Sequence, residues 1–173
     1  MSTPEFSRPV PLARVGDMPF RQEISATLGE RAALARRFDL VALDRLDAVV
    51  ELVRQGQGLV LLRAEFEAAF EQTCTVTLDP FSSVLAERFV LICGPPESEE
   101  AAAAMVGDEV AFEPLSGEAI DIGEAVSQEF SLALPPFPRS PDAAIETELP
   151  AANEAGPFAA LQRLLPRDGE KPQ

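Results

Sequence analysis

The side chains that most often carry enzymatic chemistry are absent from this chain or too few to build a site. The sequence contains no His, the commonest general base and metal ligand, and only two cysteines, Cys74 and Cys93. A Ser–His or Cys–His nucleophile is therefore excluded, and one chain cannot supply the Cys and His ligands of a closed zinc site. No Gly-rich phosphate loop of the form G-x-x-x-x-G-K-S/T or G-x-G-x-x-G occurs. We expect no catalytic residue, no cofactor and no bound metal.

Carboxylates are the one plentiful reactive group. The chain has 29 Asp and Glu against 14 Lys and Arg, a formal net charge of −15. Residues 71–173 carry 19 of these acids and 5 basic residues, whereas residues 1–70 are nearly balanced, with 10 acids and 9 Arg. Acid clusters such as Glu97, Glu99 and Glu100 are typical of solvated loops. A metal-dependent RNA-processing enzyme that uses the acids of the C-terminal half is kept as the alternative function.

The charge also limits the partners. A net negative surface repels nucleic acid at long range, so broad binding of RNA or DNA is not expected; a basic protein partner and simple solubility are both consistent with the charge. Direct RNA contact is expected only from a local arginine patch in the balanced half, because Arg can grip phosphate bidentately. The candidates are Arg8, Arg31, Arg36 and Arg37. Each of them could instead pair with a nearby carboxylate, that of Glu30, Asp39 or Asp44.

A second candidate surface lies in the segment Pro135–Arg139. Phe137 stands between prolines, so it is held rigidly and is suited to anchor a protein partner. Arg139 follows it and completes our set of candidate binding residues. Cys74 is interpreted as a half-buried strand cysteine that behaves as a small apolar residue.

The apolar residues also bear on where the protein is located. No apolar run approaches the roughly 18 residues of a membrane-spanning helix. Residues 1–16 lack the apolar stretch of a signal peptide. We therefore expect a cytoplasmic protein that has no contact with a membrane.

The elements that must position these residues are predicted by the apolar pattern. Apolar side chains alternate from residue 43, and again over 60–71, and the Gln55–Gly58 segment between them is typical of a hairpin turn. A further strand is predicted over 83–93, with Leu85, Phe89 and Leu91 on one side. Residues 73–78 continue the second strand or begin a third, and Asp79-Pro80 marks a break. The fold class is therefore α+β: an antiparallel sheet built on the 43–71 hairpin and capped by two or three helices.

Capping signals predict where the helices begin. Thr27 and Glu30 form a capping box that opens a short helix through Phe38, with Leu28 and Leu34 among its buried residues. A second such start, at Asp121 and Glu124, opens a helix over 121–134 that Pro135-Pro136 ends. A last short amphipathic helix is expected over 158–165.

The remaining segments are rich in proline, alanine or acids. The arm over 4–15 contains three prolines, so we expect an edge strand or an extended arm. Mobile loops are expected over 94–118, with a short helical turn, and over 139–156, because they bury few apolar side chains. We expect one domain over 1–165 and a disordered tail over 166–173.

Several stretches resemble motifs of the YceD family. The run Cys74-Thr-Val-Thr77-Leu78-Asp-Pro80 is similar to the family's C-x-x-C-L-x-P, with Thr77 in place of the second cysteine. A second set resembles its acidic loop, helix start and helix exit: Glu113-Pro114-Leu115, then Ile120-Asp121-Ile122-Gly123-Glu124, then Leu132-Ala-Leu134-Pro-Pro-Phe137-Pro138-Arg139. The stretches Glu5–Val10 and Glu30–Phe38 look like an alphaproteobacterial branch. The resemblance spans roughly residues 5–165.

The resemblance implies a role in the accumulation of large-subunit ribosomal RNA, and hence in ribosome biogenesis. On this basis we expect a non-enzymatic factor that binds a ribosome precursor particle, a basic ribosomal protein or an RNase. The motif residues that it marks are Cys74, Leu78, Pro80, Asp121, Gly123, Glu124 and Pro138.

Overall fold

The structure is a computed structural model that describes residues 4–106, 110–115 and 117–144. The chain divides into the units Met1–Ala143 and Ala144–Gln173, and every helix and strand described below lies in the first. The helix expected over 158–165 and the tail over 166–173 lie outside the described residues, as does most of the loop expected over 139–156.

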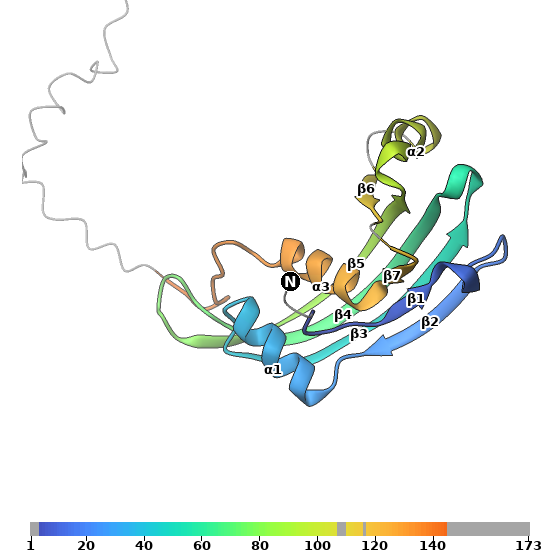
Figure 1. The fold of residues 1–173 in the computed structure, drawn as a ribbon. Helices are drawn as coiled ribbons and strands as arrows, with labels where there is room; N and C mark the ends of the chain where they lie inside the picture. The colour runs from blue at the N-terminus through green and yellow to red at the C-terminus, as the bar shows by residue number, and fades with distance from the viewer. Residues whose placement is uncertain (1–3, 107–109, 116, 145–173) are drawn as a thin grey trace, which may run out of the picture. The chain divides into compact units, whose positions relative to one another are not determined.

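A five-stranded sheet in the order β2-β3-β4-β5-β6 forms the body of the first unit (Figure 1). Its strands are β2 Phe20–Ser25, β3 Ala42–Arg54, β4 Val60–Thr73, β5 Pro80–Gly94 and β6 Ala111–Pro114. All neighbouring pairs are antiparallel except β5 and β6, which run parallel. The mostly antiparallel sheet confirms the α+β fold, and the predicted hairpin is β3 with β4.

The other elements within the described residues are three α-helices, three single turns of 3-10 helix and a second, two-stranded sheet. The α-helices are α1 Leu28–Arg37, α2 Glu99–Val106 and α3 Ile122–Ala133. The 3-10 turns are η1 Leu12–Arg14, η2 Gly56–Gly58 and η3 Pro96–Ser98. The small sheet pairs β1 Pro9–Pro11 with β7 Ala119–Asp121, so the arm does form an edge strand.

Helices α1 and α3 cover the same face of the large sheet (Figure 1). Phe130 of α3 is the centre of this layer. Its ring lies 5.5–6.2 Å, centroid to centroid, from Phe38 at the end of α1 and from Phe66 and Phe70 of β4. These edge-on contacts are the favourable geometry for aromatic pairs. They hold the ends of both helices against the central hairpin.

The alternation along β4 explains why the sheet has one covered and one open face. Leu62, Phe66 and Phe70 are buried under the helices, whereas Glu65 and Glu67 point to the other side and are exposed. Period-two alternation of this kind is expected of an antiparallel sheet with one solvated face. Among the described residues, α2 covers this second face only at the end near Ile92, against which Ala102 packs, and we call the remainder the open face.

Two strand predictions need correction. Strand β2 was not predicted, because only Phe20 and Ile24 of its residues are apolar, and pairing with β3 rather than a local pattern makes it a strand. Of residues 73–78, only Thr73 continues the second strand, and residues 74–78 do not begin a third. They turn tightly, with the Cys74 N–H bonded to the Asp79 oxygen, and Pro80 begins β5. Proline is tolerated at the first residue of a strand.

Two further predictions differ in part from the structure. The segment 94–118, expected as a loop with a short helical turn, contains the helix α2 and, beyond that expectation, strand β6, because Ala102 and Phe112 pack with Leu59 and Ile92 in a small second core. The capping box of α1 is confirmed, but Leu28 is 76% exposed rather than buried. It occupies the first position of the helix, on the side away from buried Leu34.

Candidate partner-binding site

The family-like stretch Ile120–Glu124 attaches the N-terminal arm to α3. The Asp121 carboxylate caps α3 by accepting the N–H groups of Gly123 and Glu124, both at 3.1 Å. The same carboxylate accepts the backbone N–H of Arg8 at 2.7 Å and the hydroxyl of Ser7. One side chain therefore satisfies free donors of the helix terminus and fixes a segment 113 positions away.

Gly123 allows this close approach. A Cβ atom at this position would lie 2.5 Å from the Phe6 carbonyl oxygen and 3.0 Å from the Arg8 nitrogen. Both are backbone atoms, so no flexible side chain could move aside. The arm and the first turn of α3 can be packed this tightly only with glycine in the helix.

Two of the predicted binding arginines are held by carboxylates. Arg8 donates two hydrogen bonds to Glu30, at 2.7 and 2.9 Å. Arg37 donates two to Glu124, at 3.0 and 2.8 Å, and one to Glu5 at 3.0 Å. The hydrogen bonds from Arg8 lower the pKa of Glu30 to about 2. These bidentate pairs connect the arm, α1 and α3, so the charge of each arginine is balanced inside the domain.

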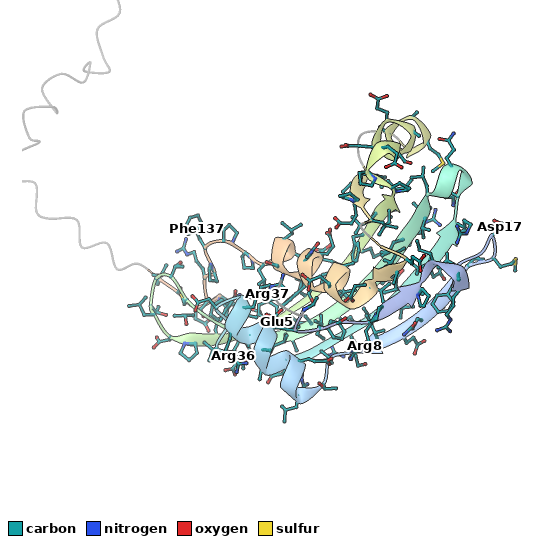
Figure 2. All side chains as sticks on the ribbon, viewed as in Figure 1. Glu5, Arg8, Asp17, Arg36, Arg37 and Phe137 are labelled. Atoms are coloured by element: carbon teal, nitrogen blue, oxygen red, sulfur yellow. The ribbon has the colours of Figure 1, made fainter. Side chains whose placement is uncertain are left out.

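The other predicted arginines lie apart from one another. Arg31 donates to the backbone oxygen of Asp44. Arg36 on α1 and Arg139 after α3 are exposed, and neither forms an ion pair with another described residue. Figure 2 shows Arg8, Arg36 and Arg37 on the arm and α1, with Phe137 on a different segment. The structure therefore does not gather the predicted binding residues into one patch.

A tight turn around the Cys74 thiol organises the end of β4. We call residues 74–79 the Cys74 turn, and Pro135–Ser140 the exit segment of α3. The Cys74 sulfur accepts the N–H groups of Val76, Thr77 and Ser140 at 3.4, 3.5 and 3.3 Å. Thr75 donates from its N–H and its hydroxyl to the Pro138 oxygen, at 2.8 and 3.0 Å. The turn and the exit segment are thus joined into one unit.

These hydrogen bonds also set the acidity of the thiol. The N–H of Ser140, followed by bonds from Thr77 and Val76, lowers the pKa of Cys74 to about 6. The side chain is fully buried, so it acts as a hydrogen-bond acceptor inside the turn rather than as a half-buried strand residue. Burial, and then the charge of Glu113, raises the pKa of Cys93 to about 12. Both cysteines are free, and the described residues contain no group of three or more Cys, Asp or Glu able to hold a metal.

Leu78 is the most unusual residue of the Cys74 turn. Its φ of 63° lies in the left-handed region, and its side chain is 75% exposed. An L-residue in this region costs about 1–2 kcal/mol relative to an ordinary conformation. Its N–H bonds the Cys74 oxygen at 2.9 Å, so the tight turn holds the strained conformation and displays the leucine to solvent.

A groove of about 1040 Å³ opens beside this turn. One wall comes from the end of α1 and the segment that leads into β3, another from the end of β4 and the Cys74 turn, and the third from the end of α3 and the exit segment. Three exposed apolar side chains line it: Val41, Leu78 and Leu132, which are 53%, 75% and 78% exposed. Phe137, also 78% exposed, stands on the exit segment between two prolines that line the groove (Figure 2).

Sequence reasoning identified only part of this groove. Phe137 and Leu78 were singled out and Leu132 was noted only as part of a family-like run, whereas Val41 was not noted and Ser140 was not connected to Cys74. Val41 and Leu132 come from segments distant in sequence, and nothing in the local pattern marks an apolar residue as exposed. The family-like runs around Cys74 and Pro138 were the only sequence signal for this groove, because they contain the turn and the exit segment that hydrogen bonds join.

Together, the fold and the groove define an α+β domain with an exposed apolar groove at one end of its central hairpin. Residues 62–165 match the model of a family described as "Large ribosomal RNA subunit accumulation protein YceD", and the chain belongs to this family. The match includes the Cys74 turn, α3 and the exit segment, whereas the stretches that suggested a particular branch, Glu5–Val10 and Glu30–Phe38, lie outside it. No curated protein and no solved structure matches the chain. Among the described residues, no helix is long and apolar enough to cross a membrane.

Proposed function

We propose that this protein supports the accumulation of large-subunit ribosomal RNA by binding a protein partner in the groove, without catalysing a reaction itself. The family description supports the process, and the groove supports the mode of action. The observation that carries the proposal is Leu78, an exposed leucine held in a left-handed conformation. Folding gains nothing from a strained, solvated apolar side chain, so its position is explained by contact with a partner.

The walls of the groove indicate a protein rather than a nucleic acid. Its large exposed apolar side chains, Val41, Leu78 and Leu132, are aliphatic, and Phe137 adds an aromatic anchor of the kind that dominates protein interfaces. Arg37 borders the groove but is already paired with Glu124 and Glu5. Direct RNA contact would be left to Arg36 and Arg139, the unpaired members of the predicted set among the described residues.

The net charge of −15 favours a basic partner. Within the process that the family description names, a basic ribosomal protein fits best. A ribosome precursor particle or an RNase, either of which would present a basic protein surface, is the other candidate. Because ribosome assembly is the process that the family description names, the proposal includes a cytoplasmic location.

The test is a matched pair of double variants. Leu132→Ala with Phe137→Ala removes two side chains at the groove that are each 78% exposed. Leu28→Ala with Met18→Ala removes two that are 76% and 81% exposed but lie elsewhere. After circular dichroism confirms folding, each variant is expressed in cells lacking the native protein, and large-subunit ribosomal RNA is quantified. We expect the groove variant to lose accumulation and the control variant to restore it.

A third variant separates protein docking from RNA contact. Arg36→Glu with Arg139→Glu reverses the charge of the two unpaired arginines. Capture of the partner from lysate is then measured over a range of salt concentrations, with and without RNase. Docking through apolar side chains should survive RNase and high salt, whereas phosphate contact should weaken steeply as salt rises. Full restoration by the groove variant would show that the proposed surface is wrong.

A further inference from the structure

Strand β5 has an open edge along most of its length. It pairs with β4 from Pro80 to Cys93, whereas β6 pairs with it only over Leu91–Gly94. Over residues 80–89, within the described part of the chain, β5 therefore has a strand neighbour on one side only. Its ladder with β4 contains no bulge, and proline occurs only at its first residue. The edge thus lacks two of the devices by which proteins block the addition of a strand.

Two hydrogen bonds show which backbone groups point out of this edge. The Cys74 N–H bonds the Asp79 oxygen, and the ladder that follows has no register shift, so odd-numbered residues of β5 bond β4. The Gly94 oxygen accepts the N–H of Leu115, on the side of β6, which shows that even-numbered residues face away from β4. The outward-facing residues of the open edge are Ser82, Val84, Ala86 and Arg88, and their side chains lie on the open face.

The side chains on the helix-covered side of the edge are arranged symmetrically about Leu85. This row contains Phe81, Ser83, Leu85, Glu87 and Phe89, which lie beside buried residues of β4. Phenylalanine stands four positions before and four positions after Leu85, and a polar residue stands two positions before and two after it. The three apolar members are only partly buried. A neighbouring strand with a matching pattern would complete their cover.

We propose that β5 pairs antiparallel with β5 of a second copy of this chain, about a two-fold axis at Leu85. The two five-stranded sheets then form one continuous sheet. On the helix-covered side, Leu85 faces its own counterpart, Phe81 faces Phe89 of the second copy, and Ser83 faces Glu87. Such an interface is isologous, because the same patch is used on both chains. None of the residues that line the Phe137 groove belongs to this edge, so the inference does not rest on the proposed function.

Glu87 restricts the pairing to this register. With the axis at Val84 or Ala86, its carboxylate would face Phe81 or Leu85, and with the axis at Glu87 it would face its own counterpart. An axis between two residues would oppose outward-facing and inward-facing backbone groups, which cannot form a ladder.

Ser83 is a suitable partner for the carboxylate of Glu87. The Ser83 hydroxyl oxygen accepts a hydrogen bond from the buried Gln72 side chain at 2.9 Å. Its own proton therefore remains free to donate. In the proposed register that proton is directed to Glu87 of the second copy, so a charge that opposes other pairings is hydrogen-bonded in this one.

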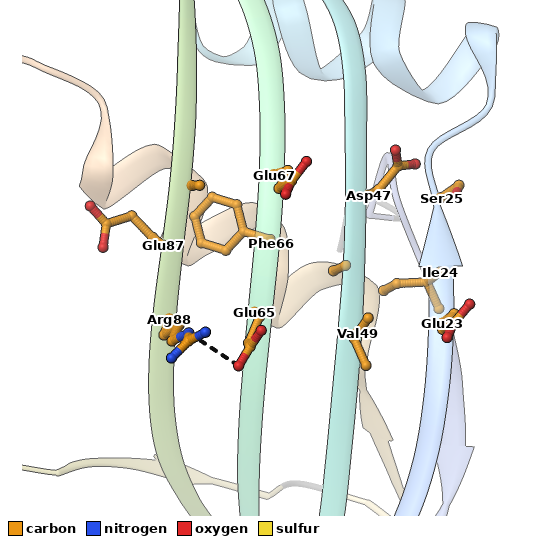
Figure 3. A pocket seen from close by; sticks show the side chains of 12 residues that line it. Glu23, Ile24, Ser25, Asp47, Val49, Glu65, Phe66, Glu67, Glu87 and Arg88 are labelled. Carbon is orange, nitrogen blue, oxygen red and sulfur yellow. Dashed lines mark ion pairs between the residues drawn. The ribbon is translucent and has the colours of Figure 1, made fainter.

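The net charge of −15 does not oppose this contact locally. Residues 80–90 contain one acid and one base, and Figure 3 shows them, Glu87 and Arg88, side by side on β5, with Arg88 bonded to Glu65. In the paired strands Arg88 faces Ser82 of the second copy, so no like charges of the two edges are directly opposed. Charges farther apart than about 8 Å are largely screened at physiological ionic strength. The second copy is named as the occupant because its own edge supplies every matching side chain.

A disulfide tests the register in the full-length chain. Opposite residues of a pair that is not hydrogen-bonded have Cα atoms about 4.5 Å apart, within the reach of a disulfide. Leu85→Cys places the two introduced thiols on the axis, so mild oxidation should give a covalent dimer. Ala86→Cys is the matched control. Its position is more exposed, but an offset of two residues separates the Cα atoms of the two copies by about 8 Å, too far for a disulfide. The native Cys74 and Cys93 are buried, so the wild type should not cross-link.

Association itself is measured by sedimentation equilibrium over a series of micromolar concentrations. We expect the wild type to dimerise reversibly. Ala86→Pro removes an outward-facing N–H from each copy and should weaken the dimer about ten-fold or more. Thermal melting checks that each variant folds. Leu132→Ala with Phe137→Ala, which alters the groove alone, should dimerise like the wild type.

Three results would each overturn the proposal. A chain that stays monomeric at every concentration would leave the edge of β5 to a strand of another protein. Equal cross-linking of the two cysteine variants would show random collision rather than a fixed register. A dimer that Ala86→Pro leaves unchanged, or that the groove variant dissociates, would place the contact elsewhere on the chain.

Discussion

Replacing Gly123 with alanine should destabilise the protein, although alanine normally favours a helix. The new Cβ would lie 2.5 Å from the Phe6 oxygen, well inside the 3.4–4 Å of ordinary contact. The arm would have to move away, and the hydrogen bonds from the Arg8 N–H to Asp121 at 2.7 Å and from the Ile122 N–H to the Arg8 oxygen at 3.2 Å would weaken. Overpacking of this kind costs about 1–3 kcal/mol. That exceeds the helix-propensity gain of up to about 1 kcal/mol.

Gly29 provides the matched control. It is the second residue of α1 after the N-cap Thr27, as Gly123 is the second residue of α3 after the N-cap Asp121. Nothing lies within 4 Å of a Cβ built at Gly29. Gly29→Ala should therefore leave the free energy of unfolding unchanged or raise it slightly. Urea denaturation of both variants checks the difference in sign. If Gly123→Ala is as stable as Gly29→Ala, the close approach of the arm does not constrain α3, and the reasoning fails.

The same contacts support three further predictions. Glu30→Gln should lower the stability at pH 7 by about 1.5–3 kcal/mol, the range for charged hydrogen bonds. Because the folded pKa of Glu30 is depressed from 4.5 to about 2, this difference should shrink as pH falls through that interval, as denaturation at pH 7 and pH 2.5 would show. Leu78→Gly should stabilise the fold by up to about 1 kcal/mol by relieving the left-handed strain, while lowering capture of the partner from lysate. Cys74→Ala should lower the melting temperature more than Cys74→Ser, because only serine keeps an acceptor for the three N–H groups. Equal melting temperatures would show that those bonds contribute nothing.

The elements that the sequence predicted well are those whose signals are local. The capping box at Thr27 and the cap at Asp121 depend on side chains within three residues, and the alternation along β4 depends on adjacent residues. Predictions from such signals agree with the structure because each signal depends on residues within or next to the element itself. The helix starts and the central hairpin could therefore be placed without a structure.

The elements that were missed depend on distant partners. Strand β2 has only two apolar residues and exists because β3 pairs with it along its whole length. Strand β6 and α2 are stabilised by Leu59 and Ile92, which come from earlier in the chain. The apolar groove has the same character, because its walls come from three segments. No pattern read along one segment could have assembled them.

The family-like motifs divide into residues that folding explains and residues that it does not. Asp121, Gly123 and Glu124 each have a structural role, since the first caps α3, the second admits the arm and the third pairs with Arg37. Cys74 likewise satisfies backbone donors. Leu78 has no such role, because its side chain is exposed and its backbone is strained. A glycine would form the same turn at lower cost, so the leucine side chain itself must be what the turn presents, and the groove beside it is where we expect a partner to bind.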